Sequence, residues 1–344
     1  MIPEKQLQEI RNYLDKSENP LFFFDDDADG SCSYILLRKY CGKGKGVMLK
    51  SIPVLDLKLF HRVEALNPDL IVVLDIAVLE QEFIDKCNVP ILWIDHHQLL
   101  KREKVHYYNP FLYDKDVKNT STTACCYEIT KKDLWIATLG AIADWTIPDY
   151  AKEFTKKYPE LFPGNIKEPS QALFETKIGF LAKILLFNLK GTTSEALKSV
   201  NSFIKIDDPH EILNQTSKAG TDIYESGNKY MKDYNKSLDN ALKCHDKDDE
   251  ILIYIYPDKK VSFTSELSNE LLYKYPEKII IVAREKGDEL KVSFRSTKHN
   301  IESKVQSAIK GLNGRFGGHD HACGGVIKSR DFDYFINNLR EELK

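Results

Sequence analysis

An apolar run at residues 90–93 leads into Ile94-Asp95-His96-His97, and this stretch constrains the fold more than any other. A run of this kind predicts a buried strand, so the Asp-His-His triplet is expected at the carboxyl-terminal tip of that strand. Charged and imidazole side chains are rarely core material. They suit metal chemistry if other carboxylates converge on the same edge of a sheet.

Two more apolar runs, at residues 21–24 and 70–74, end in the same way. The carboxylates that follow them are Asp25, Asp27, Asp29 and Asp75. A further acid, Asp144, closes a helical pattern over residues 134–143. Ligands of open α/β sheets bind outside the carboxyl ends of the strands. We therefore expect these acids and the histidines to form one site.

Strands alternate with helices of about ten residues through the first part of the chain, which predicts βαβ units and a parallel sheet. The expected strands are residues 21–24, 46–52, 70–74 and 91–94. Residues 121–203 are mostly helical in pattern, and residues 217–243 predict one long helix. After a polar segment, a second unit follows with strands at 251–256, 278–283 and 290–294, three helices and a Gly-rich loop.

The predicted fold class is α/β. An N-terminal parallel-sheet domain (residues 1–190) is joined by a helical connector (191–244) to a smaller α/β C-terminal domain (245–344), with a cleft between the two domains. Each domain is long enough to bury its own core.

Bulk composition excludes several classes of protein. The formal net charge of −3 excludes a chain-wide basic field. The seven cysteines contain no C-x-x-C pair, and the N-terminal segment is charged, so reduced thiols and a cytoplasmic location are expected. No apolar run approaches the roughly 20 residues that a membrane span requires.

The acids after the first strand indicate a cation site. Asp25, Asp27 and Asp29 repel one another unless a cation neutralises them. An EF-hand is disfavoured because Leu36 stands where the bidentate glutamate would be. Oxygen ligands with one imidazole suit Mn²⁺ or Mg²⁺, and two such ions would serve a phosphoryl displacement with Asp75 as the bridging ligand.

The neighbours of His96 leave alternatives open. His97 is expected to point away from the metals, toward a phosphate or leaving group. Asp95 either orients an imidazole or caps the following turn. Similarly, the hydroxyls of Ser121-Thr122-Thr123 either cap a helix or touch substrate.

Taken together, these motifs resemble the four ordered motifs of the DHH phosphoesterase superfamily. The resemblance implies two metal ions, usually manganese, with Asp27 and Asp29 on different metals, Asp75 bridging, and His96 with Asp144 completing the second site. Catalytic roles would then fall to Asp75, His96 and His97. Many members carry a histidine where this chain has Phe23, so Asp25 is a candidate substitute ligand.

A Gly-rich segment at residues 315–325 is the second strong feature. Its glycines let backbone amides approach a phosphate, although a tight hairpin is the alternative. Between Lys291 and Arg330, eight Lys or Arg stand against two acids, a local charge of +6 that suits a phosphate backbone.

This segment resembles the DHH-associated C-terminal domain of RecJ-type exonucleases and nanoRNases. The resemblance implies substrate contacts from His97 and from six residues of the C-terminal domain: Arg295, Ser296, Arg315, Gly317, Gly318 and His319. It disfavours the family II pyrophosphatases, whose C-terminal domain lacks this element. The architecture also resembles the short archaeal RecJ-like nucleases, which implies DNA repair and a replication or repair helicase as partner.

The predicted function is a metal-dependent exonuclease on single-stranded DNA or RNA that releases nucleoside monophosphates. The alternative is a nanoRNase, or a phosphodiesterase for linear or cyclic dinucleotides or phosphoadenosine phosphate. An inactive scaffold is the third class. It is disfavoured because the aspartates of the predicted metal site are all present, and such clustered acids are unfavourable unless a cation neutralises them.

Overall fold

The computed structural model describes residues 2–50, 54–118, 120–259 and 261–344. The chain divides into two compact units, Met1–Lys229 (the N-terminal unit) and Tyr230–Lys344 (the C-terminal unit). The division falls inside helix α12 (Lys218–Leu242), which the sequence predicts as one long helix. The three-part division at residues 190 and 244 stays a prediction.

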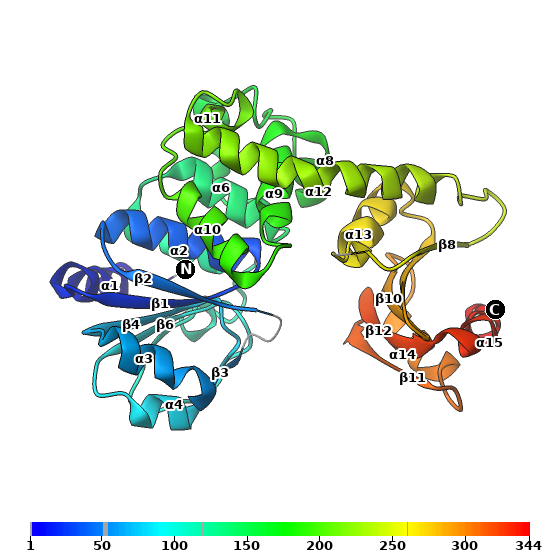
Figure 1. Cartoon of the computed structure of the whole chain (residues 1–344), viewed down its shortest axis with the longest axis horizontal. Coiled ribbons are helices and arrows are strands. Elements are labelled where there is room, and N and C mark those ends of the chain that lie inside the picture. The colour runs from blue at the N-terminus through cyan, green and yellow to red at the C-terminus, as the bar shows by residue number, and fades with distance from the viewer. Residues whose placement is uncertain (1, 51–53, 119, 260) are drawn as a thin grey trace. The chain divides into compact units, whose positions relative to one another are not determined.

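A sheet of five parallel strands forms the N-terminal unit, in the order β2-β1-β4-β6-β7 (Figure 1). The strands are β1 (Pro20–Asp25), β2 (Lys45–Leu49), β4 (Leu70–Leu74), β6 (Ile91–Ile94) and β7 (His106–Tyr108). This confirms the predicted parallel sheet. Residues 51–52 of the predicted second strand lie outside the described residues. Strand β7 was not predicted, and neither was the short ladder of β3 (Val54–Leu55) with β5 (Val78–Leu79).

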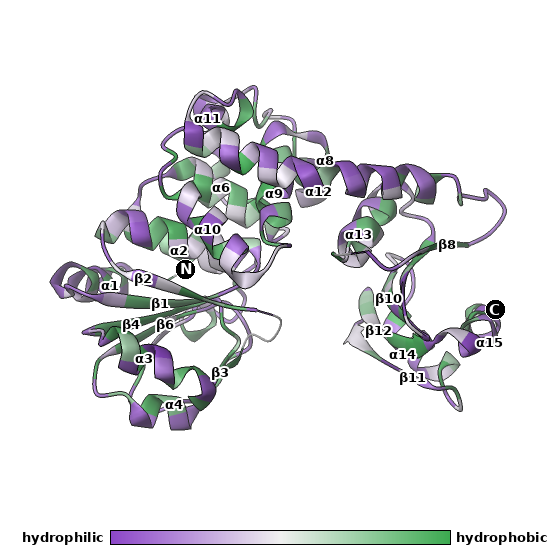
Figure 2. Ribbon diagram, in the orientation of Figure 1, coloured by the Kyte–Doolittle hydropathy of each residue, from purple (hydrophilic) through white to green (hydrophobic). Residues whose placement is uncertain are grey.

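Helices lie on both faces of this sheet, as its apolar strands require (Figures 1 and 2). The helices near the sheet are α1 (Glu4–Lys16), α2 (Ala28–Cys41), α3 (Phe60–Leu66), α4 (Gln81–Lys86), α5 (Thr122–Thr130) and α6 (Leu134–Ala143). Strand β1 shows why both faces are covered: Phe24 stacks on Tyr34 of α2 at 4.4 Å, whereas Phe23 meets Phe83 of α4 edge-on at 5.8 Å.

Further helices complete the N-terminal unit. They are α7 (Ala151–Lys157), α8 (Pro169–Glu175), α9 (Lys177–Asn188), α10 (Thr193–Phe203) and α11 (His210–Leu213). This agrees with the helical pattern predicted for residues 121–203. Among the described helices of both units, none combines the length and apolarity that crossing a bilayer requires.

The C-terminal unit is a mixed five-stranded sheet in the order β11-β12-β10-β9-β8, where β8 and β9 are parallel and the other pairs antiparallel. Its elements are β8 (Ile251–Tyr256), α13 (Thr264–Lys274), β9 (Ile279–Lys286), β10 (Glu289–Arg295), α14 (Ile301–Ala308), β11 (Gly314–His319), β12 (Ala322–Lys328) and α15 (Phe332–Leu343). The predicted smaller α/β unit is therefore confirmed.

The Gly-rich segment is not an open loop but a hairpin, which is the alternative that the sequence left open. Strands β11 and β12 form an antiparallel hairpin that turns at Asp320 and His321. Glycines disfavour strands, but β12 also pairs along its length with β10. Phe316 anchors the hairpin by packing against Phe294 and Phe335 at 5.1 and 5.3 Å between ring centroids.

Candidate metal centre

The carboxyl ends of β1, β4 and β6 lie next to one another, since these strands are neighbours in the sheet. Asp25 ends β1, Asp75 directly follows β4, and the Asp95-His96-His97 triplet directly follows β6. The shared edge brings together residues that are up to about seventy positions apart in sequence, as the strand-end pattern predicts.

The turn after β1 places two more acids at the start of α2. Asp27 caps this helix by accepting a hydrogen bond of 2.8 Å from the Gly30 amide. A Cβ on Gly30 would lie 2.8 Å from the backbone of Asp25, so this close turn requires glycine. Asp29 lies in the first helical turn and is buried, where the helix dipole favours a negative charge.

The start of α5 holds two of these carboxylates in place. The backbone amides of Thr122 and Thr123 donate to the two oxygens of Asp29 at 2.8 and 2.7 Å. The Thr122 hydroxyl donates to Oδ1 of Asp75 at 3.0 Å. Ser121 caps the helix through the Ala124 amide at 3.1 Å. The hydroxyl cluster therefore both caps α5 and orients acidic side chains.

His96 presents one nitrogen to three carboxylates. Its Nε2 lies 3.5 Å from Asp75, 3.7 Å from Asp29 and 3.9 Å from Asp144. Its Nδ1 lies 3.0 Å from the Thr120 carbonyl. A carbonyl only accepts, so Nδ1 carries the proton and Nε2 keeps the lone pair that a metal ligand needs.

His97 is held by Asp95, which is fully buried. Nδ1 of His97 lies 2.7 Å from Oδ1 of Asp95, and the His97 amide donates to Oδ2 of Asp95 at 3.0 Å. Asp95 therefore has both of the roles that the sequence suggests, because it orients the imidazole of His97 and caps the following turn. Hydrogen bonding to Asp95 raises the pKa of His97. The other nitrogen, Nε2, is left for a ligand.

Three groups of side chains place their ligand atoms within 4.8 Å of one another: Asp25, Asp27 and Asp75; Asp29, His96 and Asp144; and Asp75, His96 and His97. Asp75 belongs to two of these groups, which suits a bridging ligand. Carboxylate oxygens with an imidazole fit Mn²⁺ or Mg²⁺, and thiolate ligands of the kind zinc prefers do not occur in any of the three groups.

Burial and mutual repulsion make the acids difficult to ionise without a cation. Burial, with Asp27 nearby, raises the pKa of Asp25 to about 7. Burial, with Asp29 and Asp27 nearby, raises the pKa of Asp144 to about 9. The pKa of Asp75 is also raised well above its usual range, by burial first and by neighbouring acids second. A divalent cation would remove both penalties, so the residues fit one.

Two residues of the centre adopt left-handed backbone conformations that bulky side chains rarely take. These are Asp75 (φ 57°) and Trp145 (φ 55°), which directly follows Asp144. The Trp93 indole donates to the Ile76 carbonyl at 2.9 Å and fixes the segment after Asp75. Such strain is typical of functional sites. Trp145 has no motif that singles it out in the sequence.

Phe23, at the position where many family members have histidine, is fully buried in an apolar cluster. It cannot contribute a ligand. Asp25, two residues along the same strand face, has a carboxylate oxygen close to those of Asp27 and Asp75. Asp25 as the substitute for the missing histidine stays a prediction.

The predicted substrate residues of the C-terminal unit lie close together within that unit. Arg295 of β10 pairs with Ala322 of β12, which pairs with His319 of β11, so the three lie side by side across the sheet. Arg315, Gly317, Gly318 and His319 are exposed. Ser296 is buried, and its hydroxyl accepts from the amides of the next turn.

Arg295 already has partners inside the unit. Its guanidinium donates to Asn269 at 2.7 Å, to the Phe294 carbonyl at 2.9 Å and to Ser265 at 3.1 Å. These contacts hold the cation in one orientation beside the hairpin, which favours recognition of a fixed anion.

Two family descriptions match the chain. The DHH family N-terminal domain matches residues 21–153, and the DHHA1 domain matches residues 251–344. The chain belongs to the DHH phosphoesterase superfamily. It carries the DHH-associated C-terminal domain, as the sequence motifs predict. Among curated proteins, none matches the chain.

Several solved structures share the fold of this DHH protein. Exonuclease RecJ bound to manganese has a TM-score of 0.66 at 14% identity, covering 100% of this chain and 95% of that one. RecJ of Thermus thermophilus in complex with Mn²⁺ has a TM-score of 0.65 at 14% identity, covering 98% and 54%. The pGpG-specific phosphodiesterase PggH of Vibrio cholerae has a TM-score of 0.55 at 14% identity, covering 94% and 99%.

Proposed function

We propose that this DHH protein is a two-metal phosphodiesterase that acts as an exonuclease on single-stranded DNA or RNA and releases nucleoside monophosphates. The observation that carries the proposal is the position of Asp75. Its carboxylate belongs to one all-carboxylate group and to one group with two imidazoles, at a sheet edge rich in buried acids.

Two metal sites follow from these groups. Asp25 and Asp27 would hold one ion, Asp29, His96 and Asp144 the other, and Asp75 both. A pair of Mn²⁺ or Mg²⁺ ions supplies electrostatic stabilisation of the attacking and leaving oxygens in a phosphoryl displacement. Thr122 keeps Asp75 in its bridging position through the hydrogen bond to Oδ1.

His97 is proposed to act on the substrate rather than on a metal. Asp95 occupies its Nδ1 and raises its pKa, so Nε2 holds a proton at neutral pH more readily than an isolated imidazole would. A protonated Nε2 can donate to a phosphate oxygen or to the leaving oxygen.

The C-terminal unit is proposed to bind the nucleic-acid end. The local charge of +6 between Lys291 and Arg330 and the exposed His319 and Arg315 support this role. A replication or repair helicase as partner is proposed from the family resemblance alone.

A phosphodiesterase for very short substrates is the second candidate. The pGpG-specific phosphodiesterase PggH shares the fold over 99% of its own length, as exonuclease RecJ bound to manganese does over 95% of its length. A dinucleotide or short oligonucleotide needs few contacts, whereas single-strand binders usually add stacking platforms along a groove.

A manganese-dependent digestion series tests both candidates. The substrates are end-labelled DNA and RNA that range from dinucleotides to long single strands, resolved by product length. Stepwise release of monophosphates from long strands supports the exonuclease, and cleavage confined to the shortest substrates supports the second candidate. Absence of hydrolysis on every substrate, with Mn²⁺ bound, would refute the proposed function.

A further inference from the structure

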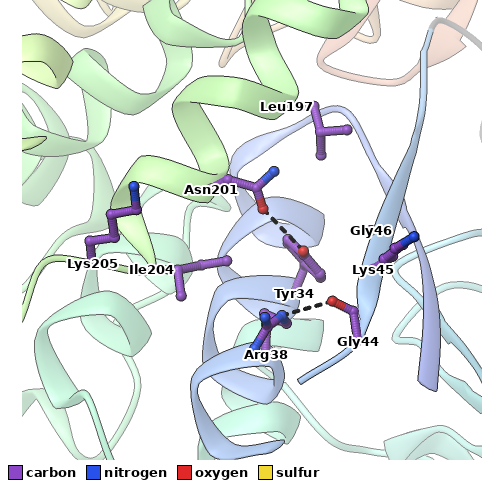
Figure 3. A pocket seen from close by; sticks show the side chains of 9 residues that line it. All are labelled: Tyr34, Arg38, Gly44, Lys45, Gly46, Leu197, Asn201, Ile204 and Lys205. Atoms are coloured by element: carbon purple, nitrogen blue, oxygen red, sulfur yellow. Dashed lines mark hydrogen bonds between the residues drawn. The ribbon is translucent and has the colours of Figure 1, made fainter. Parts of the chain in front are cut away.

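A cavity of about 450 Å³ opens beside the edge strand β2, away from the residues of the metal centre (Figure 3). Helix α2, strand β2 with the turn before it, and helix α10 with its last turn supply the walls. The residues that line it are Tyr34, Arg38, Gly44, Lys45, Gly46, Leu197, Asn201, Ile204 and Lys205. The volume falls within the range of small-molecule sites.

The charged side chains on these walls are all cations. Arg38, Lys45 and Lys205 line the cavity, and a carboxylate is absent from the described lining. Within the described residues, none of the three forms an ion pair. Their sequence neighbours behave differently: Lys39 pairs with Asp133 at 2.7 Å and Lys43 with Glu18 at 3.1 Å. Lys39 and Lys43, which lie outside the cavity lining, are thus paired with carboxylates, and the three cations of the lining are not.

Two acceptors on the wall, the Asn201 side-chain oxygen and the Gly44 carbonyl, are already used. The Tyr34 hydroxyl donates to Oδ1 of Asn201 at 3.1 Å, and Nε of Arg38 donates to the Gly44 carbonyl at 3.0 Å (Figure 3). The guanidinium also interacts with the Tyr34 hydroxyl. Arg38 is therefore held in one orientation, while the Asn201 amide nitrogen remains a donor. Such a set of groups suits an anion.

Apolar surface completes the cavity. Leu197 and Ile204 of the α10 segment line the cavity together with Tyr34, whose ring is fixed by stacking on Phe24 at 4.4 Å. A Cβ on Gly46 would lie 2.6 Å from that ring, so glycine is what allows the ring its place. A ligand that matches these walls carries both an anionic group and an apolar body.

We propose that this cavity binds a nucleoside monophosphate, with its phosphate on Arg38, Lys45 and Lys205 and its base against the apolar wall. The site lies on the same helix, α2, whose first turn carries the Asp29 carboxylate of the metal centre. The inference stands apart from the proposed nuclease activity, because it concerns a different face of the N-terminal unit.

The experiment measures binding of adenosine monophosphate to the metal-free full chain by equilibrium dialysis. Without a divalent cation the metal centre holds no ion that could coordinate the phosphate, so it does not compete for the probe. We expect one bound nucleotide, with affinity reduced about tenfold or more, roughly the loss of one charge-assisted contact, in Lys45→Glu and in Lys205→Glu. Lys198→Glu, an exposed lysine of α10 outside the lining, is the matched control and should bind as the wild type does.

Several outcomes would overturn the proposal. They are no binding of the nucleotide, unchanged binding in both charge reversals, or loss of binding in Arg315→Glu, which would place the probe on the C-terminal unit. Equal affinity for inorganic phosphate would show that the apolar wall does not bind the base. A preference for oligonucleotides would show that the surface binds a nucleic-acid strand and not a mononucleotide. Hydrolysis is not read in any arm, so failure of the proposed nuclease activity would leave these results unaffected.

Discussion

Asp25→Asn is expected to stabilise the metal-free protein and to weaken its binding of metal. Burial raises the pKa of Asp25 from 3.8 to about 7. The pKa of Asp25 is higher in the folded than in the unfolded state. Its carboxyl therefore does not lower the free energy of unfolding below pH 3.8, and it lowers this free energy increasingly as pH rises to about 7. Asparagine has nearly the same shape and does not ionise, so it avoids this cost.

The size of the effect follows from the shift. A rise of about three units in the pKa corresponds to about 4 kcal/mol in the free energy of unfolding, at 1.36 kcal/mol per pKa unit. Because Asp25 is only partly buried and solvent screens it, we expect about 2 kcal/mol. The hydrogen bond that Asp25 accepts from the Asp26 amide at 2.9 Å survives, since the asparagine oxygen also accepts.

Urea unfolding with a chelator present, at one acidic and one alkaline pH, measures this difference in the free energy of unfolding. Asp25→Asn should match the wild type at acidic pH and exceed it at alkaline pH. Saturating Mn²⁺ should reverse the order, because ligand binding stabilises only the chain that keeps its site. Asp114→Asn is the matched control, since this exposed carboxylate also accepts a nearby backbone amide at 3.0 Å. A wild type as stable as Asp25→Asn at alkaline pH would refute the reasoning.

Three further substitutions test the centre and its support. Asp75→Asn should abolish hydrolysis while circular dichroism shows an intact fold, and retained activity would rule out a bridging role. Asp95→Asn should lower kcat about 10–100-fold and shift the alkaline limb of the pH profile to lower pH, because the imidazole of His97 loses the partner that raises its pKa. Arg295→Ala should raise KM for single strands with unchanged metal content, and loss of metal would contradict a substrate role.

The sequence predicts the sheet and the acids at the strand ends because each apolar run is followed directly by an aspartate. It does not predict that Thr122 and Thr123 bind Asp29, since those contacts join residues more than ninety positions apart. Neither does it predict β7, whose three residues give too short a pattern for a period of two.

The hairpin of the C-terminal unit shows a different limit. Its glycines signal freedom of the backbone, and only tertiary pairing with β10 determines that the segment is extended. The same pairing aligns Arg295 with His319 across β12. Motif similarity names these residues, but only the strand register explains why they lie together.

The burial of Phe23 predicts how the two proposed metal sites differ. Its ring is committed to the apolar cluster with Phe83, so the group of Asp25, Asp27 and Asp75 offers only carboxylate oxygens. The other group adds the imidazole of His96. Oxygen-only sites suit Mg²⁺ as well as Mn²⁺, whereas an imidazole favours the transition metal. Calorimetric titration with Mn²⁺ should therefore resolve two steps, and excess Mg²⁺ should suppress only the one that Asp25→Asn removes. A single step insensitive to Mg²⁺ would mean that the two groups do not act as distinct sites.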